Sequence, residues 1–332
     1  MFLSKENGKN LKMLNLFQFD RDLFEGPVLV TGAGGCIGSW VLAILFQSGV
    51  STLAFDLSAE QTRVKLILSE EEASEIPWVI GNISEFENIE KAVVDYNIKA
   101  IIHLAALQVP FCANDPIQGA KANVLGTVNI FEVCRKYNIN KLVYASSVAA
   151  YGLIEKSLYK PTLYGAYKLC NENIAKVYSQ DWNINSIGLR PGVVYGIGRD
   201  QGMTSKTTEA IRAIAAKQNY TIPFSGNVGA LHAGEAASAF IKAILKYSGK
   251  AEIFDINGTC TSVSNWIKIL NSLDPNVDID FEGDPLPFPF DMPDDHIRNF
   301  LGKYPSVDLK EGIRETYNSF KVLIDRGLIK KT

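Results

Sequence analysis

The stretch Val28-Leu29-Val30-Thr31-Gly32-Ala33-Gly34-Gly35-Cys36-Ile37-Gly38 decides the fold of this chain. It begins as an apolar run and breaks into four glycines, after which residues 39–46 are again mostly apolar. That order predicts a strand, a tight turn and a helix. Glycine suits such a turn because the backbone adopts unusual φ and ψ values and a ligand approaches it closely. The free N–H groups at the start of the helix favour an anion, so the turn is predicted to hold a pyrophosphate.

An acidic residue follows the next predicted strand. Residues 51–55 form a second apolar run that leads into Asp56, about twenty residues after the turn, where dinucleotide-binding folds place the acid that binds the ribose hydroxyls. A 2′-phosphate would be repelled by Asp56, and the nearest arginine, Arg63, lies inside the next helical pattern. The pattern therefore predicts NAD rather than NADP; the alternative is a glycine-rich turn with a purely structural role.

Composition restricts the other classes of function. The chain has 332 residues, 47% of them hydrophobic, and a net charge of −3, which gives no general attraction to nucleic acid or to an anionic membrane. Charges interrupt the apolar start at residues 1–6, and no apolar run reaches the roughly 18 residues that span a bilayer. The five cysteines are widely spaced and the three histidines are scattered. We expect free thiols, no metal site and a cytoplasmic location.

The order of the predicted elements indicates an α/β fold. Apolar strand-like runs alternate with helical patterns through residues 28–190, and the runs are continuous, which is typical of a parallel sheet covered on both faces. We expect a doubly wound parallel (Rossmann) sheet with a smaller, interleaved C-terminal substrate-binding lobe. The expected parts are an N-terminal extension (1–26), an NAD-binding domain (27–191, with return elements at about 234–258) and the lobe (192–233 and 259–332).

The N-terminal extension has a weak apolar periodicity, at Leu11, Leu14, Leu16, Phe17 and Phe19. Two interpretations give it a role: it packs across the domain, or it contacts a partner subunit. The alternative is a frayed extension.

The carboxyl ends of the predicted strands carry a set of candidate site residues. Gly32, Asp56, Asn82, Ala105 and Ser147 all fall there, and ligands bind at that edge of doubly wound sheets. Asn82 is expected to contact the adenine. The strands therefore predict one site at one edge of the sheet.

A second pattern suggests acid–base chemistry. Tyr164 and Lys168 are four residues apart and share one face of a predicted helix. An adjacent ammonium favours the phenolate, so we expect Lys168 to lower the pKa of Tyr164 and make it a general base. Ser147 is expected to hydrogen-bond the substrate oxygen, and Asn123 to fix a water or a helix bulge near Lys168. The alternatives are a solvated helix face, a strand-terminal serine and an asparagine with a structural hydrogen bond.

Taken together, these residues resemble the extended short-chain dehydrogenase/reductases, in particular the NAD-dependent sugar epimerase/dehydratase group. The resemblance covers nearly the whole chain and is carried by residues 31–38, 103–106, 123–127, 146–152, 164–168, 189–196 and 307–316. It implies a Ser147, Tyr164 and Lys168 triad assisted by Asn123, bound NAD and a homodimer with a four-helix interface. The residues expected to bind the cofactor are Gly32, Gly34, Gly35, Cys36, Ile37, Gly38, Asp56, Asn82, Ile83, Leu104, Ala105, Ala106, Tyr164, Lys168 and Val193.

The departures from the group restrict the reaction. Dehydratases of the group carry an Asp-Glu pair where Val148 and Ala149 stand, so dehydration is not expected. Apolar residues replace the asparagine that meets a nucleotide diphosphate, at Val193 or Val194, and the later arginine-aromatic clamp, at residues 228–231. A nucleotide-sugar substrate is therefore disfavoured.

We expect an enzyme that oxidises a secondary alcohol of a sugar-like substrate, either as an epimerase or as a net dehydrogenase. A small sugar acid or polyol is the alternative to a nucleotide sugar, and a non-catalytic NAD-binding sensor is the alternative to an enzyme. The residues expected to bind the substrate are Gln108, Ser147, Val148, Arg199 and Thr204. For Arg199 the competing interpretation is a surface loop in which it pairs with Asp200.

Overall fold

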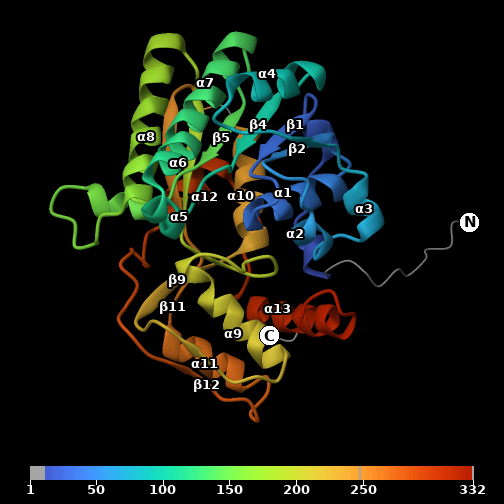
Figure 1. Ribbon diagram of the computed structural model, residues 1–332, viewed down its shortest axis with the longest axis vertical. Helices are drawn as coiled ribbons and strands as arrows, with labels where there is room; N and C mark the ends of the chain where they lie inside the picture. Colours follow the sequence, from blue (N-terminus) through green and yellow to red (C-terminus); the bar gives the residue numbers. More distant parts are fainter. Residues whose placement is uncertain (1–11, 247, 331–332) are drawn as a thin grey trace, which may run out of the picture.

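The computed structural model describes residues 12–246 and 248–330. Its centre is a seven-stranded sheet in the order β10-β6-β5-β4-β1-β2-β3, in which every pair of neighbours is parallel. The predicted doubly wound sheet is therefore confirmed (Figure 1). The strands are β1 (Val28–Thr31), β2 (Thr52–Asp56), β3 (Trp78–Ile80), β4 (Ala100–His103), β5 (Leu142–Ala145), β6 (Ser186–Pro191) and β10 (Ala251–Ile256).

Helices cover both faces of this sheet. The first face carries α1 and α10, which pack against each other, and the second carries α4, α7 and α8. Each face has its own buried cluster of aliphatic and aromatic side chains, as expected for strands that are apolar on both sides. The helices that precede the smaller lobe are α1 (Cys36–Gln47), α2 (Thr62–Lys65), α3 (Glu70–Ser74), α4 (Phe86–Asp95), α5 (Val109–Asn114), α6 (Pro116–Ala120), α7 (Gly126–Tyr137) and α8 (Leu163–Trp182).

A smaller lobe, lowest in Figure 1, follows the sixth strand of the sheet. It contains a three-stranded sheet, β11-β9-β7, and a two-stranded sheet, β12-β8. Between β9 and β11 the chain returns through α10 (Ala233–Ile244) to β10, which pairs with β6. The remaining elements are β7 (Val193–Tyr195), α9 (Lys206–Ala215), β8 (Tyr220–Ile222), β9 (Asn227–His232), β11 (Thr259–Ser262), α11 (Val263–Asn271), β12 (Ile279–Phe281), α12 (Asp295–Leu301) and α13 (Leu309–Asp325).

The described part of the N-terminal segment packs onto the main body. Phe17 is buried, stacks on His232 and makes an edge contact with Trp40 of α1. Leu14 is buried as well, whereas Leu16 is exposed. Of the periodic positions noted in the sequence, Leu11 lies outside the described residues. The segment thus packs across the fold, as the first of the two interpretations expected.

Candidate active site

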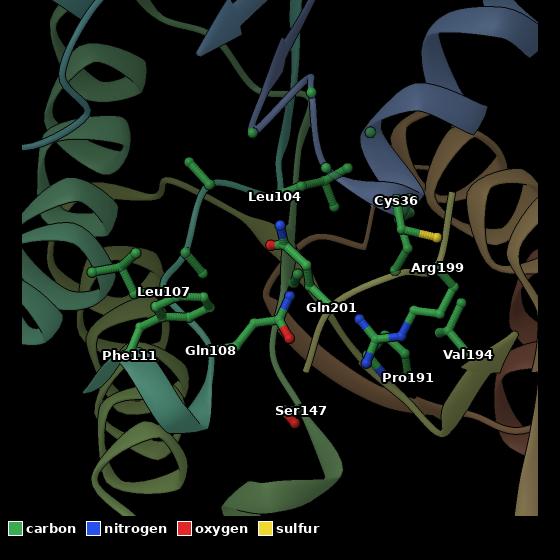
Figure 2. A pocket seen from close by; sticks show the side chains of 18 of the residues that line it. Cys36, Leu104, Leu107, Gln108, Phe111, Ser147, Pro191, Val194, Arg199 and Gln201 are labelled. Carbon is green, nitrogen blue, oxygen red and sulfur yellow. The ribbon is translucent and has the colours of Figure 1, made fainter. Parts of the chain in front are cut away.

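A cavity of about 580 Å³ lies at the carboxyl ends of the central strands. Its lining begins at Gly32 after β1 and includes Asp56 at the end of β2, Leu104 after β4 and Ser147 after β5. Residues from the smaller lobe, among them Arg199, face it from the other side (Figure 2). The cavity therefore lies at the edge of the sheet that the strand ends predicted as the site.

The glycine turn forms one wall of this cavity. Gly32 has a φ of +67°, and a Cβ there would lie 2.6 Å from the backbone nitrogen of Ala105, so only glycine fits. The turn leads into α1, whose N-cap is Gly35 and has no side-chain cap. The N–H groups of this helix start thus line the cavity without a side-chain acceptor at the cap, which fits the pyrophosphate of a dinucleotide.

Asp56 is fixed at the edge of the same turn. Its Oδ2 accepts a hydrogen bond from the Gly34 backbone N–H at 2.8 Å, and its Oδ1 accepts one from Leu57 at 2.7 Å. Arg63 is held beside it, because it donates to the Gly34 carbonyl and, through Nε and Nη2, to Asp200 of the smaller lobe. The Arg63 guanidinium is therefore engaged. This arrangement fits a ribose with free hydroxyls better than one with a 2′-phosphate.

Ser147, Tyr164 and Lys168 lie together in the lining of the cavity. All three line it, although Ser147 lies after β5 and the other two lie on α8. Lys168 is only 3% exposed, and its Nζ donates to the Ala145 carbonyl at 2.6 Å. The same Nζ lies 5.5 Å from the centre of the Tyr164 ring. The one-face arrangement predicted for the tyrosine and lysine is present.

The pKa values of this pair differ from the prediction. Burial raises the pKa of Tyr164, and the hydrogen bond with Ser147 and the positive charge of Arg199 oppose that rise only in part. Burial also lowers the pKa of Lys168 to about 8. The expected net lowering of the Tyr164 pKa by Lys168 is therefore wrong for the protein without ligand, because the cost of burying the charged forms is the largest effect on both groups.

Asn123 sits in a π-helical turn, Lys121–Leu125, between α6 and α7. Its Nδ2 donates to the Leu107 carbonyl at 3.1 Å and to Cys112 Sγ at 3.2 Å. Its own carbonyl accepts a hydrogen bond from Asn171 of α8. The helix bulge that the sequence suggested is thus present, and Asn123 braces the segment that follows β4 instead of facing the cavity.

Most of the predicted site residues surround the cavity. Asn82 is placed differently, because its Oδ1 accepts from the N–H and the hydroxyl of Ser84, and neither Asn82 nor Asn123 belongs to the described lining. The predicted residues in the lining are Gly32, Gly34, Gly35, Cys36, Ile37, Gly38, Asp56, Ile83, Leu104, Ala105, Ala106, Gln108, Ser147, Val148, Tyr164, Lys168, Val193, Arg199 and Thr204.

The loop 198–205 brings polar groups over the cavity. Gly202 has a φ of +92°, and a Cβ there would lie 2.1 Å from Gln108 Oε1, so this loop rests directly on Gln108. Arg199 donates to Thr204 at 2.8 Å, while its buried Nε has no hydrogen-bond partner among the described residues. Figure 2 shows Gln108, Gln201 and Arg199 pointing into the same space. The alternative pairing of Arg199 with Asp200 is wrong, because Asp200 pairs with Arg63.

A buried ion network links α8, which carries Tyr164 and Lys168, to β6. Glu172 lies one turn after Lys168 on α8 and is 1% exposed. Arg190 of β6 donates to both of its carboxylate oxygens, at 2.7 and 2.6 Å, and the Ser146 hydroxyl donates to one of them at 2.5 Å. The residue that precedes Ser147 and the helix that carries Lys168 are therefore joined through one carboxylate.

Several cavity residues were missed by reasoning from the sequence. Leu107, Phe111 and Arg63 line the cavity, and so does Phe288 of the proline-rich segment after β12. Position after a strand end was a usable signal for Leu107 and Phe111. No local pattern marks Phe288, because its place depends on how the smaller lobe packs against the sheet.

The fold and the site together define a dinucleotide-dependent oxidoreductase of the extended short-chain dehydrogenase/reductase type. The family model described as the NAD dependent epimerase/dehydratase family matches residues 28–257. The chain belongs to this family, and its cofactor is NAD.

Known proteins resemble the chain along most of its length. A Methanocaldococcus jannaschii protein provisionally assigned as a UDP-glucose 4-epimerase is 28% identical over 89% of this chain and 98% of its own. The Thermus thermophilus UDP-glucose 4-epimerase in complex with NAD superposes with a TM-score of 0.74 at 23% identity, over 89% of this chain and 99% of that one. The GalE-like L-threonine dehydrogenase of Cupriavidus necator gives a TM-score of 0.78 at 18% identity, over 89% and 100%.

No helix among residues 12–246 and 248–330 is long and apolar enough to cross a membrane. These ranges also contain no group of three or more His, Cys, Asp or Glu side chains placed to hold a metal ion. All five cysteines are free thiols, as expected.

Proposed function

We propose that the enzyme oxidises a secondary alcohol of a small sugar-like molecule. The observation that carries this proposal is the meeting of Ser147, Tyr164 and Lys168 in the cavity that also contains the glycine turn. Tyr164 takes the hydroxyl proton, while Ser147 hydrogen-bonds the same oxygen and keeps it near the phenol. NAD, when bound, accepts the hydride from the carbinol carbon. The substrate thus loses one proton and one hydride and becomes a ketone.

The remaining residues of the cavity bind and orient the cofactor in this proposal. The N–H groups at the start of α1 hold the pyrophosphate and Asp56 holds the adenosine ribose. Lys168 reaches the nicotinamide ribose, and its charge favours the phenolate of Tyr164. Burial lowers the pKa of Lys168 only to about 8, so the group is still a cation beside the base at neutral pH, and its bond to the Ala145 carbonyl fixes its place.

Two overall reactions share this first step. An epimerase returns the hydride to the other face of the ketone, whereas a dehydrogenase releases the ketone and NADH. The names of the relatives include both kinds of enzyme. The two are separated by net NADH production.

One observation favours a small acid or polyol as substrate. Arg199 faces the cavity, its Nε has no hydrogen-bond partner in the part of the chain that the structure describes, and Asp200, which could have neutralised it, is bound by Arg63. A cation without a carboxylate partner suits an anionic group on the substrate. In addition, Val228 and Ala230 of β9 are buried in the core, so the strand that would carry a diphosphate clamp offers it no charged group.

We also propose that the smaller lobe holds the substrate and that two chains associate through α8. Leu163, Cys170 and Val177 lie along one side of this helix and are exposed. Leu125, also exposed, lies on the π-helical turn that packs beside α8. An apolar stripe of this kind fits a homodimer interface. Sedimentation should show a dimer in the wild type and a monomer after Val177→Glu; a wild-type monomer would contradict the interface.

The experiment that tests the reaction compares two tyrosines of one helix. Tyr164→Phe removes the base, so turnover should fall on the order of a hundredfold or more, with NAD affinity little changed. Tyr167→Phe is the matched control, because its hydroxyl donates to the Pro116 carbonyl and it is not among the described residues of the lining.

The assay follows NADH absorbance and product formation with sugar acids, polyols and UDP-sugars. Arg199→Ala should raise KM for acidic substrates more than for neutral ones. Near-normal turnover by Tyr164→Phe would contradict the role of the base. Efficient use of a UDP-sugar alone, unaffected by Arg199→Ala, would contradict the small-acid alternative.

A further inference from the structure

The proline-rich segment 284–292, called here the proline strap, is held at both ends. At its start the Ser225 N–H donates to the Asp284 carbonyl at 3.2 Å, and Ser225 forms a β-bridge with Pro285. Near its end Asn257 Nδ2 donates to the carbonyls of Phe290 and Met292, at 2.9 and 3.3 Å. The middle of the strap is therefore positioned by the smaller lobe on one side and by the loop after β10 on the other.

The middle of the strap carries Phe288, which reaches the active site. Phe288 is 9% exposed and forms a buried cluster with Val148, Ala149 and Met292, against which Tyr164 packs. Phe288, Val148 and Ala149 also line the cavity. The two residues that follow the catalytic Ser147 thus form, together with Phe288, an apolar wall beside the catalytic phenol.

The apolar wall is matched by polar groups elsewhere in the cavity. Arg199, Gln108 and Gln201 project into the space above Ser147 in Figure 2. A substrate hydroxyl set against the wall would lose its bonds to water and gain no partner, which is unfavourable. A methyl or methylene group there would gain from burial instead.

Resting on the proposed oxidation of a secondary alcohol, and on its small-acid substrate in place of a polyol or a sugar, we propose that Phe288 determines substrate specificity by selecting a short aliphatic substituent on the carbinol carbon. The substrate is then a small hydroxy acid: its carboxylate lies toward Arg199, its reacting hydroxyl between Ser147 and Tyr164, and its methyl or ethyl end against Phe288. A hydroxymethyl group or a sugar ring at that end is disfavoured.

The test uses a homologous series with the full-length enzyme and NAD: 3-hydroxybutanoate, 3-hydroxypentanoate, 3-hydroxyhexanoate and 3,4-dihydroxybutanoate. The wild type should prefer 3-hydroxybutanoate to the dihydroxy compound by about tenfold or more in kcat/KM, since pockets discriminate by such factors for small changes. Phe288→Ala should move the preference by about tenfold toward the hexanoate. Met292→Ala, in the same cluster but outside the described lining, should leave the ratios unchanged.

Phe288→Leu is the second variant if Phe288→Ala does not fold, and NAD binding reports folding for each. An unchanged ratio in a folded Phe288 variant, or a wild-type preference for the dihydroxy compound, would overturn the proposal.

Binding of the same acids to the NADH complex, followed by NADH fluorescence, separates the two proposals. A Phe288-dependent preference in binding without any oxidation would contradict the proposed reaction but support the role of the wall. Oxidation with a preference that does not depend on Phe288 would support the proposed reaction but contradict the role of the wall. If the series is neither oxidised nor bound, the small hydroxy acid is wrong.

Discussion

Replacing Glu172 with glutamine should destabilise the protein far more than the same change at Glu132. Glu172 is 1% exposed and accepts three hydrogen bonds, two from Arg190 and one from Ser146. Glu132 also pairs with an arginine, Arg135, but there the two side chains are 31% and 45% exposed. Glu132 also accepts a hydrogen bond from the Tyr178 hydroxyl at 2.7 Å, so each carboxylate has one arginine and one hydroxyl partner, and the two sites differ chiefly in burial.

The expected magnitudes follow from that difference. Removing one partner of a buried ion pair costs about 3–5 kcal/mol, because the other charge is left without compensation. Two features reduce the cost here: glutamine keeps a carbonyl acceptor, and Asp255 lies 3.8 Å from Arg190. We therefore expect a loss of about 2–3 kcal/mol for Glu172→Gln. An exposed pair contributes at most about 1 kcal/mol, which is the limit for Glu132→Gln.

Urea unfolding followed by circular dichroism measures both free energies of unfolding. The Glu172 variant should also have a lower kcat, because Glu172 joins the helix of Lys168 to the residue before Ser147. A loss of similar size in both variants would refute the reasoning from burial. So would full stability of Glu172→Gln with an unchanged midpoint and slope.

Two further predictions concern the cofactor and pH. Wild-type protein should bind NAD at least tenfold more tightly than NADP, a difference of about 1.4 kcal/mol, and Asp56→Ala should reduce that preference. Titration with both cofactors measures the two affinities, and equal affinities in the wild type would contradict the prediction. Lys168 has a pKa of about 8 in the folded protein, whereas its ordinary value is 10.5. Between these two pH values the unfolded chain binds more protons than the folded protein. The contribution of Lys168 to the free energy of unfolding therefore rises with pH. Wild type should therefore gain thermal stability relative to Lys168→Met from about pH 8 to 10.5, and a constant difference would show that Lys168 is not destabilised by burial.

Local sequence predicted several features well because their causes are local. The turn is marked by four glycines among residues 32–38, and the sheet buried on both faces is marked by continuous apolar runs, so both are visible in a few consecutive residues. The Tyr164 and Lys168 pair is visible for the same reason, since four residues make one helical turn. Asn82, whose Oδ1 accepts hydrogen bonds from Ser84, is not among the described residues of the lining, so its contact with the adenine stays a prediction.

The sequence by itself therefore determined the class of fold and the cofactor, and it placed the proposed catalytic residues close to one another along the chain or at a strand end. Tertiary structure alone decided which side chains face the cavity from the smaller lobe and from the connecting segments. Arg63 binds Asp200, Phe288 closes the wall beside Tyr164, and burial reverses the expected change in the Tyr164 pKa. The physical reason is that each of these depends on segments far apart in the chain, and on the loss of water where they meet, which no local pattern of residues records.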